Sequence, residues 1–281
     1  MIETNLFGGI GNQLFQFLAG IKFSKKKKTK AVYSFKYKTT FSKIHKSNID
    51  DVFELEYNFK KKYKYKNYFL ILKKNIHYFF LKFNLNIFFI NEKNFFYSKK
   101  KNELFGYFQD QKFFPFPQTK IIKLLNFKKK KKFERIFRKV FKKKNLVSIH
   151  IRRGDYIYGK SLNTYNILNY KYYFKAIKII KKKIKRPHFL VFSDDLNYTK
   201  KFFSKNFKSI NYDIVDTKND DENLYLMTKC HHNIIANSTF SWWGAYLNKN
   251  KNKIVISPKY WFKKSFDNKK NKLIDQRWIL I

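Results

Sequence analysis

Apolar residues after position 145 alternate between strand spacing and helix spacing, and this pattern predicts the fold of that part of the chain. Short apolar runs of strand length alternate with stretches in which apolar residues recur every three or four positions. The predicted strands are Leu146–Ile151, His188–Ser193, Ile210–Val215, Asn233–Ala236 and Lys253–Ser257. The predicted helices are Tyr170–Lys183, Leu196–Phe203, Asp221–Lys229 and Phe240–Leu247. Such alternation is typical of an α/β fold with a doubly wound parallel sheet.

The start of the chain predicts a strand, a glycine turn and a helix. Ile2–Phe7 has strand character, and Gly8–Gln13 contains three glycines. The apolar residues from Leu14 to Ile21 then follow helical spacing, and Ala31–Phe35 predicts a second strand. A glycine turn of this kind lets backbone N–H groups and a helix N-terminus approach an anion or a sugar. Its spacing does not match GxGxxG, and no P-loop lysine follows, so neither nucleotide fingerprint is present.

The middle of the chain has a weaker pattern. Residues 36–105 are rich in aromatic residues and lysine without a clean period, and we expect helices there without assigning their bounds. Gly106–Asp110 and Phe114–Pro117 predict an ordered loop, and helices are predicted at Lys120–Phe127 and Phe133–Lys144.

Two lysine-containing stretches bear on domain organisation and on membrane insertion. Residues 128–132 are five consecutive lysines, which indicate a solvated face or a linker. We expect two domains, residues 1–143 and 144–281. The most apolar stretch, Tyr68–Ile90, carries three lysines within it, which argues against a spanning helix.

Composition indicates a folded, strongly basic protein. The 281 residues are 44% hydrophobic and include 34 Phe and 20 Tyr, which is ample for a buried core. Lys and Arg number 63 against 19 Asp and Glu, a formal charge of +44. Lys, Asn, Ile, Phe and Tyr are all encoded by A- and T-rich codons, so we attribute the charge mainly to codon composition. Nucleic-acid binding is therefore not the preferred interpretation, although the field attracts anions such as sugar nucleotides and acidic lipids.

The paired arginines in His150–Asp155 are the most informative local feature. Only six of the basic residues are arginine, and two of them are adjacent here, directly after a predicted strand. The planar guanidinium binds phosphate or carboxylate through two points, which lysine does poorly. The alternative is an ion-paired surface turn. Ligands of parallel sheets bind beyond the carboxyl ends of strands, a rule that selects His150–Asp155, Ser193–Asp195 and Asn237–Ser241.

Each of the other polar clusters has a structural alternative. Asp194 and Asp195 resemble an acidic metal-binding pair, but an aspartate before Leu196 is also a favourable helix N-cap. Adjacent residues of a strand point to opposite faces, so Cys230–His232 does not predict a zinc site. The hydroxyls of Asn237–Gly244 could hold phosphate oxygens, or they could cap a helix whose tryptophans enter the core. No metal site is predicted.

Four motifs resemble those of the α-1,2-fucosyltransferases of glycosyltransferase family 11. Gly8–Gln16 is similar to the glycine segment near the N-terminus of that family. His150–Tyr156 matches the HxRRxD motif at every defining position, and Phe192–Asp195 and Ile235–Ala245 resemble two later motifs. The motifs occur in the family's order and extend from residue 8 to residue 245.

The resemblance implies a GT-B-like fold, with two Rossmann-type domains facing across a cleft. Residues 144–281 would bind GDP-fucose, and residues 1–143 would form the acceptor side. The implied reaction is inverting transfer of L-fucose from GDP-fucose to the 2-hydroxyl of a terminal galactose on a surface glycan or its precursor. No metal ion and no cofactor other than the donor substrate are implied.

The resemblance also assigns roles to individual residues. Arg152 is expected to contact the β-phosphate, and Arg153 to hold the turn or assist. Asp155 would orient an arginine or bond to the base or ribose, and Asn12 would reach the leaving group or the acceptor. The remaining residues expected to bind the donor are His150 and Asp195 toward guanine, Asp194 beside them, and Ser238, Thr239 and Ser241 toward phosphate. The general base stays unassigned.

Two alternatives remain open at this point. One is a transferase that uses another GDP-sugar, and the other is a non-catalytic basic protein that binds nucleic acid or an anionic membrane. No signal-peptide pattern precedes the first strand, so a cytoplasmic location is expected. Peripheral attachment to the inner face of the membrane through the basic surface is left open.

Overall fold

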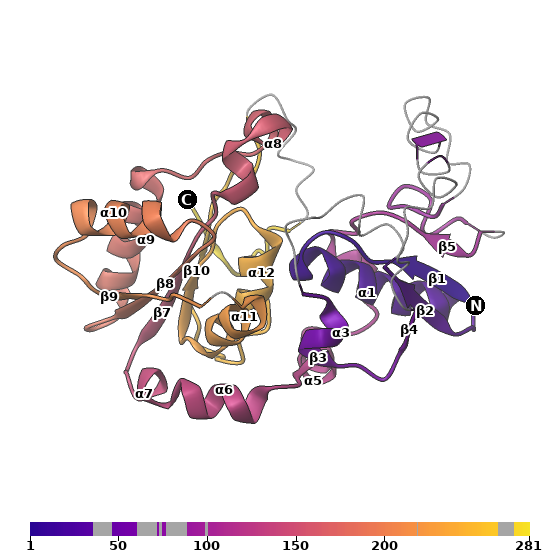
Figure 1. The fold of residues 1–281 in the computed structure, drawn as a ribbon, viewed down its shortest axis with the longest axis horizontal. Coiled ribbons are helices and arrows are strands. Elements are labelled where there is room, and N and C mark those ends of the chain that lie inside the picture. Colours follow the sequence, from indigo (N-terminus) through magenta and orange to yellow (C-terminus); the bar gives the residue numbers. More distant parts are fainter. Residues whose placement is uncertain are drawn as a thin grey trace. The chain divides into compact units, whose positions relative to one another are not determined.

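The computed structural model describes two compact units of the chain, residues 1–128 and residues 129–281 (Figure 1). We expected the boundary after residue 143, whereas the first unit ends at residue 128. The two helices between residues 128 and 143 belong to the second unit. The structure describes residues 1–35, 47–60, 72, 75–76, 89–98, 101–217, 219–263 and 273–281. For residues 60, 159 and 160 it describes the backbone alone. Most of the membrane candidate Tyr68–Ile90 lies outside them.

The first unit is built on a parallel sheet with the order β4-β2-β1-β5. As predicted, β1 (Ile2–Asn5) leads through the glycine turn into α1 (Ile10–Lys26), and β2 (Ala31–Ser34) follows. The outer strands are β4 (Asn58–Lys60) and β5 (Glu103–Leu104). Gly8 has φ +74, and a Cβ there would lie 2.8 Å from the amide nitrogen of Asn12, so the turn requires glycine.

The remaining elements of this unit are short. They are α3 (Ile49–Val52), β3 (Phe53–Glu54), the 3-10 helix η1 (Gln111–Phe113), α5 (Gln118–Leu124) and β6 (Asn126–Phe127). The prediction of one helix over Lys120–Phe127 was wrong at its end, because Asn126 and Phe127 pair antiparallel with β3. Of the helices expected in residues 36–105, α3 is described, and much of that range lies outside the described residues.

The second unit follows the predicted alternation closely. Its strands are β7 (Leu146–Ile151), β8 (His188–Ser193), β9 (Asn211–Ile214), β10 (His232–Ile234), β11 (Val255–Ser257) and β12 (Ile279–Leu280). Its helices are α6 (Lys130–Ile136), α7 (Arg138–Phe141), η2 (Gly154–Ile157), α8 (Gly159–Thr164), α9 (Tyr170–Lys183), α10 (Leu196–Asn206), α11 (Asp220–Lys229) and α12 (Thr239–Tyr246). The predicted helix Phe133–Lys144 is split into α6 and α7, and α8 and β12 were not predicted.

The sheet of the second unit has the strand order β12-β11-β10-β7-β8-β9, and all of its pairs are parallel. The predicted doubly wound sheet is therefore confirmed. The chain runs outward from β7 through β8 to β9 and then returns to the other side of β7 at β10. This reversal places a topological switch point at the carboxyl ends of β7 and β10, where sheets of this kind bind their ligands.

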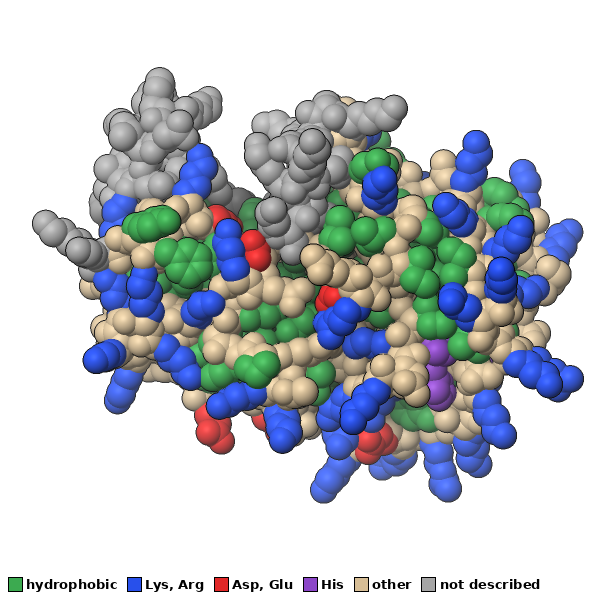
Figure 2. All heavy atoms as spheres, turned by 180° about the vertical axis from the view of Figure 1, so that it is seen from behind, with side chains coloured by type: hydrophobic (Ala, Val, Ile, Leu, Met, Phe, Trp, Pro, Cys, Tyr) green, Lys and Arg blue, Asp and Glu red, His purple; other side chains and the backbone are tan. Residues whose placement is uncertain are grey.

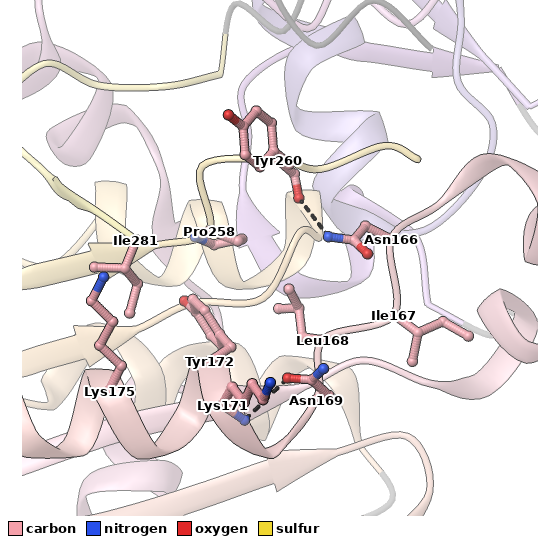
Figure 3. A pocket seen from close by; sticks show the side chains of 10 residues that line it. All are labelled: Asn166, Ile167, Leu168, Asn169, Lys171, Tyr172, Lys175, Pro258, Tyr260 and Ile281. Atoms are coloured by element: carbon pink, nitrogen blue, oxygen red, sulfur yellow. Dashed lines mark hydrogen bonds between the residues drawn. The ribbon is translucent and has the colours of Figure 1, made fainter. Parts of the chain in front are cut away.

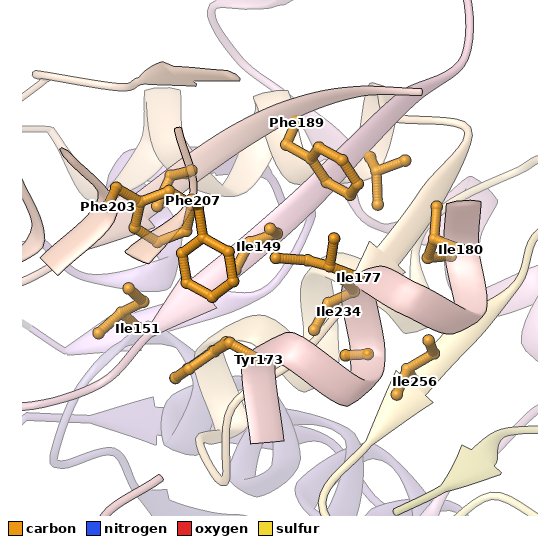
Figure 4. Close-up of a cluster of buried hydrophobic side chains, with 13 residues drawn as sticks. Ile149, Ile151, Tyr173, Ile177, Ile180, Phe189, Phe203, Phe207, Ile234 and Ile256 are labelled. Carbon is orange, nitrogen blue, oxygen red and sulfur yellow. The ribbon is translucent and has the colours of Figure 1, made fainter. Parts of the chain in front are cut away.

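Alternate residues of the central strands build two separate cores. Val147, Ile149 and Ile151 pack with Tyr173 and Ile177 of α9 and with Phe203 of α10 in the larger cluster (Figure 4). Leu146, Leu190 and Phe192 point to the opposite face and pack against Leu226 and Met227 of α11. Successive side chains of a strand point to opposite faces of the sheet, so each strand contributes to both cores. This alternation also directs His150 to the α11 face.

Lysine and arginine side chains cover much of the face shown in Figure 2, with few carboxylates among them. In the part of the chain that is described, no helix is long and apolar enough to cross a membrane.

Candidate functional site

The ends of β7 and β8 lie side by side and bring two predicted motifs together. Ile151 pairs with Ser193 in the parallel register, so the arginine turn after β7 lies next to the acidic turn after β8. Gly154 allows this approach, because a Cβ there would lie 2.4 Å from a carboxylate oxygen of Asp194. A side chain at that position would displace the Asp194 carboxylate.

Arg152 is held between two carboxylates. Its Nη1 lies 2.8 Å from Oδ2 of Asp194, and its Nη2 lies 2.5 Å from Oδ1 of Asp155. The guanidinium carbon stands 5.2 Å from the ring centre of Tyr156. Burial opposes the charge, but Asp194 and Asp155 outweigh it and raise the pKa of Arg152. Its buried Nε has no hydrogen-bond partner among the described residues.

Arg153 is fixed through both its backbone and its side chain. Its N–H donates to Oδ1 of Asp194 over 2.8 Å, and its Nε donates to Oδ2 of Asp195 over 3.2 Å. The guanidinium lies 3.5 Å above the ring of Tyr198 on α10, a cation–π contact. Asp195 is also the N-cap of α10, since its Oδ1 accepts the N–H of Tyr198. The predicted capping role is confirmed.

The described cluster contains more negative than positive groups. Two guanidinium groups, Arg152 and Arg153, face three carboxylates, Asp155, Asp194 and Asp195. A diphosphate would add further negative charge at this point. Its contact with Arg152 would compete with two carboxylates, of which Asp155 is the more exposed, at 36% against 25% for Asp194.

His150 is buried on the α11 side of β7. Its side chain packs 5.9 Å from the ring of Phe240, and its Nδ1 has no hydrogen-bond partner within the described part of the chain. Burial, with a smaller effect from the charge of Arg152, lowers the pKa of His150 to about 3. The imidazole is therefore neutral near pH 7 and is suited to hydrogen bonding rather than to charge stabilisation.

This depressed pKa makes a prediction about acid stability. Between the folded pKa of about 3 and the ordinary value of 6.5, the unfolded chain binds more protons at His150, so stability falls as the pH falls. From pH 7 to pH 5 the wild type should lose about 2 kcal/mol more unfolding free energy than His150→Gln. Denaturant titration of both proteins at the two pH values measures this difference. Equal losses would contradict it.

The loop between β10 and α12 forms the other side of the switch point. Ser238 is the N-cap of α12 and accepts the N–H of Phe240 over 3.3 Å. The hydroxyl of Ser241 bonds to the backbone of Ala236 and Ser238, so it holds the loop in shape. Thr239 is partly buried at the first position of the helix. Trp242 and Trp243 are fully buried, as expected for core residues.

Tyr156 joins this loop to the arginine turn. Its hydroxyl donates to the carbonyl oxygen of Asn237 over 2.9 Å, while its ring stacks on Tyr165 at 4.0 Å. Tyr156 and Tyr198 therefore support Arg152 and Arg153, and the sequence prediction assigned no role to either. Tyr156 follows the last defining residue of the motif, and Tyr198 has the spacing of an ordinary helix residue, so only the fold reveals these contacts.

Asn12 lies in the first unit. Its Oδ1 accepts a hydrogen bond of 2.9 Å from Nε2 of Gln109, which connects the glycine turn to the predicted ordered loop. The predicted donor-binding residues all lie in the second unit.

The side chains of Cys230–His232 have structural roles next to the sheet. The ring Nδ1 of His231 accepts the N–H of Leu146, and that of His232 accepts the N–H of Ile254. Cys230 is buried, and burial raises the pKa of its thiol. Across the described ranges, no group of three or more His, Cys, Asp or Glu is placed to hold a metal ion.

A family comparison decides what kind of protein carries this site. The sequence model of glycosyl transferase family 11 matches residues 1–281. The chain belongs to glycosyl transferase family 11. The resemblance seen in the four motifs is thus confirmed, and the chain is a member of this family along its whole length.

Two bacterial relatives of this family 11 chain differ in how much of it they match. An α-1,2-colitosyltransferase of Escherichia coli is 29% identical over 95% of this chain and 96% of its own length. The O-antigen biosynthesis glycosyltransferase WbnK of Escherichia coli is 40% identical over 51% of this chain, which spans about half (47%) of that relative. A galactoside α-(1,2)-fucosyltransferase 1 of Bos taurus is 27% identical over 36% of this chain and 29% of its own length.

Solved structures share the fold of this family 11 chain. The crystal structure of NodZ α-1,6-fucosyltransferase soaked with GDP-fucose has a TM-score of 0.50 at 11% identity, covering 88% of this chain and 91% of that one. POFUT1 in complex with GDP has a TM-score of 0.50 at 12% identity, covering 89% and 97%. At such low identity these likenesses show the fold alone, and the predicted GT-B-like α/β class is confirmed.

Proposed function

We propose that this family 11 enzyme transfers L-fucose from GDP-fucose, with inversion, to the 2-hydroxyl of a terminal galactose. The acceptor would be a surface glycan or its precursor. The observation that carries the proposal is the paired-arginine turn, which lies at the switch point of a doubly wound sheet in a chain that matches the family along its whole length. The α-1,2 linkage in the names of relatives supports the same reaction.

The chemistry explains why guanidinium groups are needed at this position. The sugar passes through an oxocarbenium-like state while GDP leaves with additional negative charge on its β-phosphate. Fixed donors directed at the oxygen on which charge develops stabilise that state more than they stabilise the bound donor. We assign this task to Arg152 rather than to a metal ion, and turnover should therefore persist in EDTA.

Arg152 would reach the phosphate by exchanging one of its carboxylate partners. In the proposed exchange Asp155, the more exposed partner, yields to the β-phosphate, while Asp194 keeps Nη1 in place over 2.8 Å. The free Nε adds a donor that no described residue uses. Arg153, fixed on Asp195 and Tyr198, would hold the turn rather than make the main phosphate contact.

The remaining donor contacts are proposed from position. Neutral His150 and Asp195 are candidates for reading guanine. Ser238, Thr239 and the free N–H groups at the start of α12 are candidates for phosphate oxygens. Ser241 would contribute mainly by shaping that loop, since its hydroxyl bonds to loop backbone. Asn12 keeps its proposed role toward the leaving group or the acceptor.

A second donor must be considered, because one relative is an α-1,2-colitosyltransferase. The match to this chain covers 96% of that relative's length. Colitose is fucose without the 3-hydroxyl, so the two donors differ at one position of the sugar. The acceptor partner in either case would be a galactose-terminated glycan, since the name of the Bos taurus relative refers to galactosides.

Donor choice is tested by calorimetry with GDP, GDP-fucose, GDP-colitose and UDP-galactose, followed by the mass of the product formed with a galactoside. We expect GDP and GDP-fucose to bind saturably, UDP-galactose not to bind, and the product to gain one fucosyl unit. A gain of one colitosyl unit only would favour the second donor. Steeply salt-dependent binding to nucleic acid or anionic membrane without any response to GDP would contradict both.

A further inference from the structure

A pocket of about 260 Å³ lies between the start of α9 and the segment that follows β11 (Figure 3). It belongs to the second unit and includes none of the residues assigned to the donor. Its volume is slightly below the range of ~300–1,000 Å³ for sites of drug-sized ligands. A volume of this size is suited to a single sugar unit. Its lining residues that matter here are Asn166, Leu168, Lys171, Lys175, Tyr172 and Tyr260.

The walls of the pocket are held by hydrogen bonds to backbone carbonyl oxygens. The side-chain amide of Asn237 donates to the carbonyl oxygens of Asn166 and Trp261, each over 2.7 Å. The N–H of Asn166 donates to the same Trp261 carbonyl over 3.1 Å. The hydroxyl of Tyr172 donates to the carbonyl of Ile235 over 2.6 Å. These bonds make the pocket a preformed feature of the fold.

The side chains that line the pocket include two lysines and no Asp or Glu. Among the described residues, the ammonium groups of Lys171 and Lys175 have no ion-pair partner. Residues 156–193, which include all of α9, contain no Asp or Glu. Figure 3 shows Lys175 extending from α9 toward Ile281 at the pocket. The bound group should therefore be an anion.

The rest of the lining is suited to a sugar. Tyr260 is 52% exposed at the pocket, so its ring offers a face on which a sugar can stack. Leu168 and Pro258 add apolar surface, while the side-chain amides of Asn166 and Asn169 bond to the backbone of Tyr260 and Lys171 and hold the wall in place. A bare inorganic anion would leave the ring and the apolar surface without contacts. We infer that this pocket binds a saccharide unit that carries a carboxylate.

The inference is independent of the donor chemistry and is tested by binding. The probes are methyl β-D-glucuronide and methyl β-D-glucoside, which differ by the carboxylate, and neither is a galactoside. The full chain is titrated with each probe and followed by NMR. The glucuronide should bind saturably, and the glucoside should bind about tenfold more weakly.

Variants locate the binding. Lys171→Gln combined with Lys175→Gln should weaken glucuronide binding about tenfold, and Tyr260→Ala should weaken it severalfold. The matched control is Lys178→Gln, on the same helix but not in the lining, and it should leave binding unchanged. GDP affinity should be the same in all four proteins, which separates this result from the outcome for the donor site.

Three results would overturn the inference. Equal binding of the glucuronide and the glucoside would show that charge plays no part. Full competition by inorganic phosphate, with the Tyr260→Ala variant unaffected, would reduce the pocket to an anion site. Loss of binding in Lys178→Gln equal to that in the double variant would indicate general attraction to a basic surface.

Discussion

Replacement of Arg152 by lysine is expected to lower kcat/KM about 10²–10³-fold, or about 3–4 kcal/mol of transition-state stabilisation. Lysine keeps the charge and can still pair with Asp194, but it loses the planar fork that spans Asp194 and Asp155 or a phosphate. The thermal midpoint should change little, because the ammonium retains one carboxylate partner. Steady-state kinetics with GDP-fucose and a galactoside measures the effect.

Arg277→Lys is the matched control for this substitution. Arg277 also forms a two-point pair with a carboxylate, Asp275, but it lies near the end of the chain and away from the arginine turn. This variant should keep near-normal kcat/KM. If Arg152→Lys also kept near-normal turnover, or if both variants lost activity equally, the assigned role of Arg152 would be wrong.

Removal of the Asp194 side chain by alanine is expected to reduce kcat/KM about 30-fold, which corresponds to about 2 kcal/mol. Asp194 holds Nη1 of Arg152 and also accepts the N–H of Arg153, so it positions both arginines. We place the expected loss of kcat/KM at the low end of the range for removing one partner of a buried charge pair, because the Asp194 carboxylate is 25% exposed.

Conservative substitution distinguishes positioning from general loss of structure. Asp194→Asn retains an oxygen that can accept the N–H of Arg153, and it should recover part of the lost kcat/KM. Asp216→Ala, which removes an exposed partner of Lys200, is the matched control and should behave like the wild type. Failure of Asp194→Ala to alter kcat/KM while GDP-fucose still binds would exclude the positioning role.

Sequence patterns predicted the second unit well because its elements satisfy their spacing locally. Leu146–Ile151, Tyr170–Lys183 and His188–Ser193 have the bounds that the apolar pattern indicated. The two strands are short apolar runs because both of their faces are buried, and the helix shows a period of 3.6 because it buries one face. The two-residue strand β12 is too short to show a period, and it lies at the edge of the sheet, paired with the three-residue strand β11.

The first unit was harder to predict for a related reason. The segment Asn126–Phe127 continues the apolar spacing of α5, but pairing with Phe53 and Glu54 makes it a strand. That partner is distant in sequence, so nothing local distinguishes the strand from one more turn of helix.

The sequence by itself determined which motifs make up the candidate site: the arginine pair, the acidic turn, the hydroxyl-rich helix start and the order in which they occur. It could do so because residue type and order are local properties. Only the tertiary structure decided that Asp194 and Asp155 hold Arg152, that Tyr156 and Tyr198 support the arginines, and that lysines and Tyr260 meet around one pocket. The contacts made by Asp194, Tyr198 and Tyr260 join segments that are far apart along the chain, whereas those of Asp155 and Tyr156 depend on how the arginine turn itself is folded.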